Sequence, residues 1–198
     1  MNHTLSALQE LIEIVAKLRS PDGGCPWDLA QTPETLTPYI VEEAYEVVYA
    51  IKSGQKKAIV DELGDLLLQV FLQAQIASEA NDFTLAEVAE NINQKMIRRH
   101  PHVFDKKEIN SNDVEKNWEN IKIEEGNDSV LSGVPVSLPP LIKAKRIQEK
   151  TSNIGFDFKN DKQNIDKIKE EIIVFNTEVS KNKRDLIEEE FGDIIFSL

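Results

Sequence analysis

Two stretches decide the fold that we expect: YIVEEAYEVVYAI, residues 39–51, and IVDELGDLLLQVF, residues 59–71. Both are largely apolar, and each carries acidic residues three apart, which share one face of a helix. These residues, which we call the carboxylate set, are Glu43 and Glu46 on the first stretch and Glu62 and Asp65 on the second. Carboxylates of like charge repel one another, and burying them unpaired is costly. The pattern therefore predicts a hard divalent cation such as Mg²⁺ held between two helices.

The composition limits the class of protein. The 198 residues suffice for one domain or two small ones, and few Gly and Pro with mixed charges favour a globular helical chain. A net charge of −12 argues against non-specific binding to nucleic acid or to an anionic membrane. The lone Cys25 fits a reducing compartment, and the N-terminal segment lacks the pattern of a signal peptide. No apolar run is long enough to span a bilayer, so we expect a cytoplasmic protein.

Apolar spacing and capping residues predict several helices before residue 101. The first covers residues 5–18 and ends at the PDGG turn, which leads into a loop with the sequence CPWD, residues 25–28. The next begins near Thr32 or Thr37 and ends near Gly54. A capping box of Thr84 and Glu87 opens a later helix that ends before Pro101.

The helix predicted at residues 57–80 has an unusual composition. It is apolar on almost every side, which is typical of a helix inside a bundle or at a subunit interface. Gly64 within it weakens a helix by about 1 kcal/mol relative to Ala. We expect that Gly64 is present because a neighbouring backbone packs closely against the helix there.

The rest of the chain contains a shorter helix, a linker and a second acidic pair of helices. The shorter helix is predicted at residues 112–125 and contains Trp118, and the linker GNDSVLSGVPVSLPP follows it. A basic helix and the loop sequence GFDF come next. The predicted domains are residues 1–110, a helix and linker at 111–140, and residues 141–198.

An internal repeat links the two acidic regions. At a constant offset of 128 positions, acidic residues and a glycine of the first region coincide with identical residues of the second. The coincident positions in the second region are Glu170, Glu171, Glu190, Gly192 and Asp193. Val174 stands at the position equivalent to Glu46, and the chain stops soon after Asp193. We therefore expect the second half to be an incomplete copy of the first.

The acidic motifs closely resemble those of the MazG family of nucleoside triphosphate pyrophosphohydrolases, within the all-α NTP pyrophosphatase superfamily. The motifs are EEAYE at residues 42–46 and ELGD at residues 62–65. The resemblance continues along essentially the whole chain in the same order, through CPWD, RRHPHVF, SVLSGVP, GFDF and EEEFGD.

The resemblance implies a fold, a reaction and several site residues. The fold is all-α, a four-helix bundle that is completed by dimerisation, so a homodimer is expected. The reaction is cleavage of an NTP between the α and β phosphates to NMP and pyrophosphate, with Mg²⁺ as cofactor and Mn²⁺ as a substitute. Clearance of aberrant nucleotides (house-cleaning) is the role that the family suggests. The carboxylate set matches the family's metal ligands, and Lys95 and Arg99 match positions that contact the nucleotide.

The residues themselves suggest further roles. Glu42, rotated about 100° on the helix from its neighbour in the carboxylate set, is a candidate to orient or deprotonate a water molecule, and Asp61 is a weaker one. Lys95, Arg98 and Arg99 suit a phosphate tail and equally suit the C-terminal end of a helix. Trp27, in its loop, suits stacking on a base or anchoring the loop to the core.

Two other functions compete with a pyrophosphohydrolase. A carboxylate-bridged di-iron bundle needs Glu-x-x-His motifs, and no Glu in this chain has His three residues later. A non-catalytic helical dimerisation or regulatory module would retain the fold without turnover, and the complete carboxylate set argues against it.

Overall fold

The computed structural model describes residues 3–104, 129–158 and 160–197, and all regular secondary structure in these ranges is helical. The predicted helix at residues 112–125, with Trp118, lies outside the described residues. The first half contains α1 (His3–Leu18), α2 (Pro26–Leu29), α3 (Thr37–Ser53), α4 (Lys56–Glu79), α5 (Leu85–Arg99) and α6 (Pro101–Phe104). The second half contains α8 (Pro140–Asn153), α9 (Asp161–Lys181) and α10 (Arg184–Ser197). The all-α prediction is confirmed.

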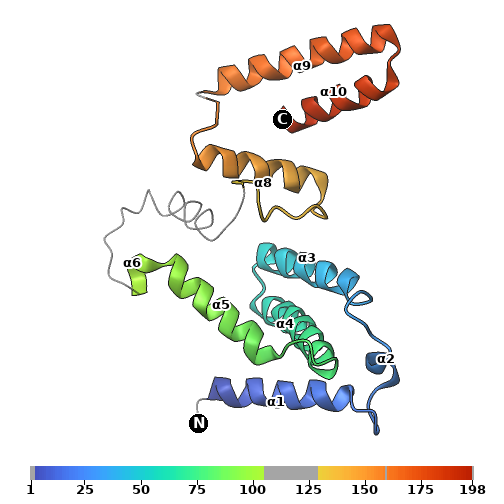
Figure 1. The fold of residues 1–198 in the computed structure, drawn as a ribbon, viewed down its shortest axis with the longest axis vertical. Coiled ribbons are helices and arrows are strands. Elements are labelled where there is room, and N and C mark those ends of the chain that lie inside the picture. The colour runs from blue at the N-terminus through green and yellow to red at the C-terminus, as the bar shows by residue number, and fades with distance from the viewer. Residues whose placement is uncertain (1–2, 105–128, 159, 198) are drawn as a thin grey trace. The chain divides into compact units, whose positions relative to one another are not determined.

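The chain divides into two compact units, Met1–Arg98 and Arg99–Leu198. In the first unit, α3 and α4 lie side by side and antiparallel, and α1 crosses near the end of α4 (Figure 1). Its core gathers Val15 of α1, Leu36 before α3, and Phe71 and Leu72 of α4. Among the described helices, none combines the length and the apolar composition that a bilayer crossing requires.

Local signals set the ends of the helices. Pro38 occupies the first turn of α3, where a missing backbone N–H costs nothing, and Gly54 ends α3 with φ +70°. The capping box is confirmed, because the Thr84 N–H donates to Glu87 Oε2 at 2.8 Å and the Glu87 N–H donates to Thr84 Oγ1 at 3.2 Å. Short-range interactions therefore determine where α3 ends and where α5 begins.

The two acidic helical hairpins repeat each other closely. Gly54 between α3 and α4 and Asn182 between α9 and α10 stand 128 positions apart, and both adopt the left-handed conformation, at φ +70° and +54°. The helices on either side end and begin at equivalent positions, Ser53 with Lys181 and Lys56 with Arg184. The repeat seen in the sequence is therefore a repeat of structure.

The packing expected around Gly64 is wrong within this chain. A Cβ built at Gly64 meets no atom within 4 Å, and the equivalent Gly192 is equally open. Several apolar side chains of α4 are also exposed, with Val60 at 60% and Leu63 at 48%. One face of α4 is therefore uncovered in the single chain.

Candidate metal centre between α3 and α4

The hairpin of α3 and α4 brings the predicted ligands together. Carboxylate oxygens of Glu43, Glu62 and Asp65 all lie within 4.8 Å of one another. Glu43 and Glu62 are half-buried, whereas Asp65 is exposed. The three residues come from facing stripes of two neighbouring helices, so their spacing depends on the packing of α3 against α4.

The electrostatics of the cluster are unfavourable without a cation. Burial raises the pKa of Glu43, and the charges of Asp65 and Glu46 raise it further. Burial likewise raises the pKa of Glu62, followed by the charges of Glu46 and Asp65. Glu46, the fourth member of the carboxylate set, is therefore close enough to act on both residues.

The donor set fits a hard divalent cation. Glu43 Oε2 is buried and has no hydrogen-bond partner among the described residues. Mg²⁺ prefers carboxylate oxygens and usually keeps several waters, which the exposed side of Asp65 allows. The arrangement could therefore hold Mg²⁺ at the position where the carboxylates converge.

We expect Mg²⁺ to raise the melting temperature of the protein more at pH 8 than at pH 5. Because the pKa values of Glu43 and Glu62 are raised by folding, their stabilising contribution is present at acid pH and is lost as the pH rises through their folded values. At pH 8 a cation would replace the missing protons. Thermal melts by circular dichroism with and without Mg²⁺ measure the difference, and the absence of any gain at pH 8 would contradict a cation site.

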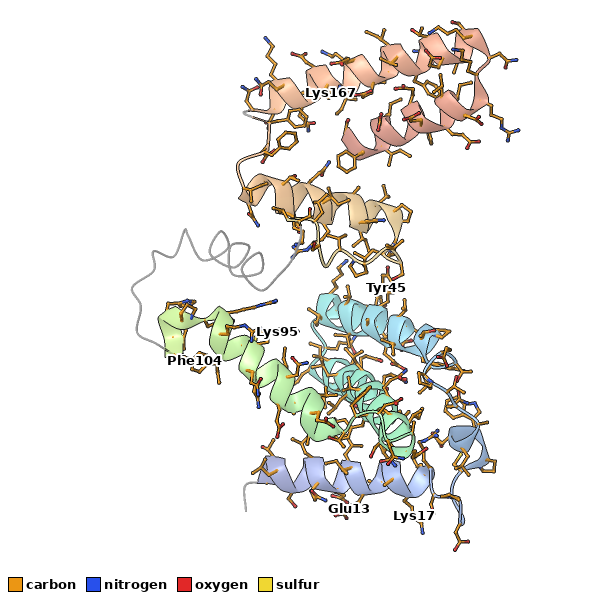
Figure 2. The ribbon with its side chains drawn as sticks, viewed as in Figure 1. Glu13, Lys17, Tyr45, Lys95, Phe104 and Lys167 are labelled. Atoms are coloured by element: carbon orange, nitrogen blue, oxygen red, sulfur yellow. The ribbon has the colours of Figure 1, made fainter. Side chains whose placement is uncertain are left out.

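The other predicted site residues are not members of this cluster. Glu42 is exposed on α3, and Lys95, Arg98 and Arg99 lie on the last two turns of α5. In the described chain, α5 packs on the core through its first residue, Leu85 (Lys95 is labelled in Figure 2). Beyond burial, the carboxylates of Glu46, Asp65 and Asp61 raise the pKa of Glu62. The α3–α4 hairpin thus gathers the metal ligands, whereas the predicted cations lie on another helix, α5.

Trp27 lies on α2 and is 51% exposed. Its ring meets the ring of Tyr39 nearly edge-on, with centroids 5.8 Å apart and an angle of 78° between the planes. Tyr39 precedes Glu43 by one helical turn, so this aromatic pair lies near one end of the carboxylate set. The sequence interpretation missed Tyr39, although its spacing from Glu43 is a signal that could have indicated it.

A buried ion pair fixes the loop that carries Trp27. Arg19 is 7% exposed, and its guanidinium donates to both carboxylate oxygens of Glu79, with Nη2 2.7 Å from Oε2 and Nε 3.0 Å from Oε1. Its Nη1 donates to the carbonyls of Asp28 and Gln31, which lie on either side of the end of α2. The Gln31 side chain in turn donates to the Trp27 carbonyl at 2.9 Å. Arg19 therefore joins α1, the α2 loop and α4, and no sequence pattern had indicated it.

The second unit contains an equivalent cluster that is paired with a lysine. Oxygens of Glu171, Glu190 and Asp193 lie within 4.8 Å of one another. Lys167 Nζ lies 2.6 Å from Glu171 Oε1 and 3.0 Å from Glu170 Oε1, and these bonds raise the pKa of Lys167. A lysine of the same helix thus already neutralises part of the second cluster.

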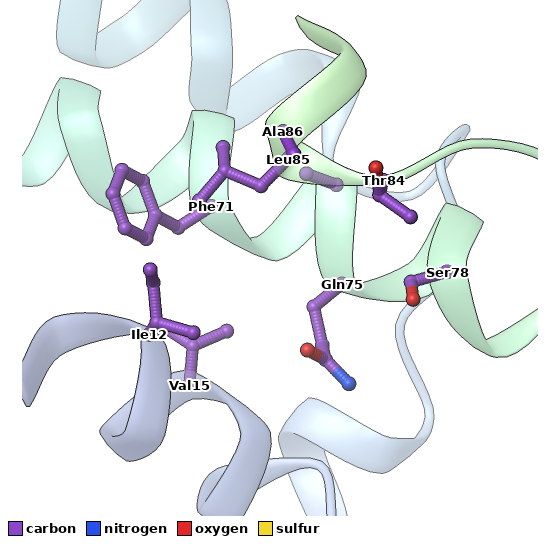
Figure 3. A pocket seen from close by; sticks show the side chains of 9 residues that line it. Ile12, Val15, Phe71, Gln75, Ser78, Thr84, Leu85 and Ala86 are labelled. Carbon is purple, nitrogen blue, oxygen red and sulfur yellow. The ribbon is translucent and has the colours of Figure 1, made fainter. Parts of the chain in front are cut away.

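A described cavity lies away from the carboxylates. Its volume is about 220 Å³, and it opens between α1, α4 and the start of α5. Ile12 and Val15 face Phe71 and Leu85 across it, with Gln75, Ser78 and Thr84 at its polar side (Figure 3). It contains no acidic or basic lining residue, so it does not resemble a phosphate or metal site.

Comparisons with known proteins agree with one another. Residues 31–104 match the MazG nucleotide pyrophosphohydrolase domain. The chain is 44% identical over 193 residues to the nucleoside triphosphate pyrophosphohydrolase/pyrophosphatase MazG of Thermotoga maritima, covering 96% of this chain and 73% of that protein. It is 40% identical over 200 residues to the nucleoside triphosphate pyrophosphohydrolase of Escherichia coli K12, covering 98% of this chain and 76% of that protein.

A solved structure is also similar. The crystal structure of a mazG-related protein from Thermotoga maritima superposes with a TM-score of 0.50 at 28% sequence identity. The match covers 58% of this chain and 98% of that one.

Proposed function

The chain belongs to the MazG family, and from that premise we propose that it is a nucleoside triphosphate pyrophosphohydrolase that cleaves NTPs between the α and β phosphates in a Mg²⁺-dependent reaction. The products would be NMP and pyrophosphate. The single observation that carries the proposal is the convergence of Glu43, Glu62 and Asp65 within 4.8 Å, in a family whose named relatives are such enzymes.

The carboxylate set would hold the cation, with Mn²⁺ as a substitute for Mg²⁺. When bound, Mg²⁺ supplies neutralisation of the triphosphate charge and a water molecule of lowered pKa. Phosphoryl transfer depends mainly on positioning and charge neutralisation, so no covalent nucleophile is required. Glu42, exposed beside the set, would orient or deprotonate the attacking water.

The substrate would be held by residues outside the carboxylate set. Lys95, Arg98 and Arg99 would hold the phosphate tail, with the two arginines using forked hydrogen bonds. Trp27 would stack on the base, and its 51% exposure supports this role over that of a buried anchor.

Incubating the full chain with each NTP and Mg²⁺, and separating the products by ion-exchange chromatography, tests the proposed reaction. NMP with pyrophosphate is expected. NDP with phosphate would indicate a different hydrolase, and no metal-dependent product would support the alternative of a non-catalytic dimerisation or regulatory module.

We place the active centre in the first of three regions, residues 1–110, 111–140 and 141–198. Two observations support the first region: its carboxylate set has four acidic residues, whereas Val174 replaces one in the second copy. In the second copy Lys167 also binds Glu171 at 2.6 Å, which would compete with a cation there.

A homodimer would cover the apolar face of α4. This face consists of Val60, Leu63, Leu67 and Val70, which recur at helical spacing and are 60%, 48%, 37% and 44% exposed. Gly64 adjoins this face and has open space around it, which would let the backbone of a second chain approach closely. Such an uncovered apolar face is typical of a subunit interface.

Val70→Glu should convert the dimer to a monomer, because a charge would be buried in the apolar interface. Light scattering after size-exclusion chromatography measures the mass. Gln94→Glu, which adds the same charge at an exposed position of α5, is the matched control and should remain dimeric. A Val70→Glu variant that stays dimeric would move the interface elsewhere.

A further inference from the structure

The second acidic hairpin carries a lysine that the first hairpin lacks. Lys167 on α9 stands 128 positions after Tyr39 on α3, and its Nζ lies 2.6 Å from Glu171 Oε1 (Lys167 is labelled in Figure 2). The same Nζ lies 3.0 Å from Glu170 Oε1, so one ammonium group pairs with two carboxylates. A tyrosine side chain carries no positive charge, so the first hairpin cannot neutralise its carboxylates from the equivalent position.

The carboxylate that Lys167 contacts is the buried member of the second cluster. Glu171 is 8% exposed, and its carboxylate lies within 4.8 Å of those of Glu190 and Asp193. At the equivalent position of the first hairpin, Glu43 has a buried Oε2 with no hydrogen-bond partner among the described residues. The same position of the repeat is therefore unsatisfied in one copy and bonded to an ammonium group in the other.

A second lysine acts further along α9. Lys181 Nζ bonds Glu178 Oε1 at 2.5 Å, and Glu178 is 8% exposed. Burial raises the pKa of Glu190, and neighbouring charges that include Glu178 raise it further, so Glu178 belongs to the electrostatic surroundings of the cluster. The equivalent residues of the first hairpin are Ala50 and Ser53, which carry no charge. Thus α9 has two lysine–glutamate pairs for which α3 has no counterpart.

The burial of Glu171 makes its pairing with Lys167 more than a surface ion pair. Lys167 is 39% exposed, and an ion pair between two exposed side chains contributes little in water. The Glu171 side chain is only 10% exposed, so salt and water screen this pair less. A divalent cation bound to Glu171 would lie beside the ammonium group, and repulsion at such a distance weakens binding by about tenfold or more.

We propose that Lys167 replaces the cation in the second hairpin, which makes this hairpin a metal-independent copy of the first and a latent cation site. The lysine occupies the buried carboxylate of Glu171 and repels a divalent cation from Glu190 and Asp193. The repeat implies a second cation site, and the residues present do not fit one. Without the lysine, three carboxylates within 4.8 Å of one another would favour Mg²⁺ or Mn²⁺.

Binding of Mn²⁺ to the full chain, followed by electron paramagnetic resonance, tests this inference. Glu62→Gln removes a ligand of the first hairpin and serves as the background. We expect Lys167→Met in this background to bind Mn²⁺ at least about tenfold more tightly than Glu62→Gln alone, and a further Glu190→Gln to abolish the gain. Lys169→Met removes the same charge from an exposed position of α9, where Lys169 pairs with Asp166 at 3.7 Å, and should give no gain.

Two further substitutions separate the charge of Lys167 from its packing. Lys167→Arg keeps the charge and should give no gain in Mn²⁺ affinity, whereas Lys167→Gln removes the charge and should behave as Lys167→Met. Equal gains in Lys167→Arg and Lys167→Met, or no gain in either neutral variant, would overturn the inference. So would tight Mn²⁺ binding by Glu62→Gln that Glu190→Gln removes, because the second hairpin would then bind a cation beside its lysine. None of these measurements requires nucleotide turnover, so failure of the proposed reaction leaves them unaffected.

Discussion

Glu62→Gln should lower the NTP turnover of this protein about a thousandfold or more, because it removes one charged ligand from the centre that neutralises the triphosphate. The substitution keeps the shape of the side chain. It also removes a charge from a cluster in which Glu46 and Asp65 already raise the pKa of Glu62. The metal-free variant should therefore melt at or above the temperature of the wild type, and its stabilisation by Mg²⁺ should be largely lost.

The internal repeat supplies the control for this experiment. Glu190 is the equivalent of Glu62 at an offset of 128 positions, and it lies in the cluster that already contains the Lys167–Glu171 ion pair. Glu190→Gln should leave turnover within about twofold of the wild type. If Glu190→Gln abolishes turnover and Glu62→Gln does not, the active centre lies in the second copy. Wild-type rates in both variants would reject carboxylate-bound metal catalysis by either hairpin.

Arg19→Ala should lower the free energy of unfolding of the first unit by about 3 kcal/mol, or roughly 10 °C in melting temperature. The guanidinium is 7% exposed and bonds Glu79 and the carbonyls of Asp28 and Gln31, all of which would lose a donor. Denaturation by urea, followed by circular dichroism, measures the change. Lys17→Ala, at an exposed position two residues earlier, is the control and should change stability by a few tenths of a kcal/mol.

The pH dependence of this difference checks its cause. The hydrogen bond from Arg19 lowers the pKa of Glu79, so the stability that this pair provides is present above the pKa of the unfolded carboxyl and is lost as the pH falls through the folded value. The difference in free energy of unfolding between wild type and Arg19→Ala should therefore become smaller below about pH 4. If this difference did not depend on pH, the lost stability would come from packing and from the bonds to the loop carbonyls, and not from the ion pair.

The helices and the candidate ligands could be predicted from the sequence because the signals that determine them are short-range. Gly54 ends α3 because it adopts φ +70° at no steric cost, and the Thr84–Glu87 capping box opens α5 through bonds between residues three apart. Helical spacing alone places Glu43 with Glu46, and Glu62 with Asp65, on one face of each helix. The offset of 128 positions predicted a second hairpin, whose turn at Asn182 repeats that at Gly54.

Only the tertiary structure decided which distant residues meet and which surfaces stay open. Arg19 and Glu79 are 60 positions apart, and no local spacing relates them. The ring contact between Trp27 and Tyr39 and the hydrogen bond from Gln73 to the Pro33 carbonyl join α2, α3 and α4, a relation that periodicity within one helix does not encode. The sequence likewise predicted close packing at Gly64, whereas the fold leaves that position open. Local chemistry sets where a helix begins and which face is acidic, and burial against the rest of the chain determines what that face contacts.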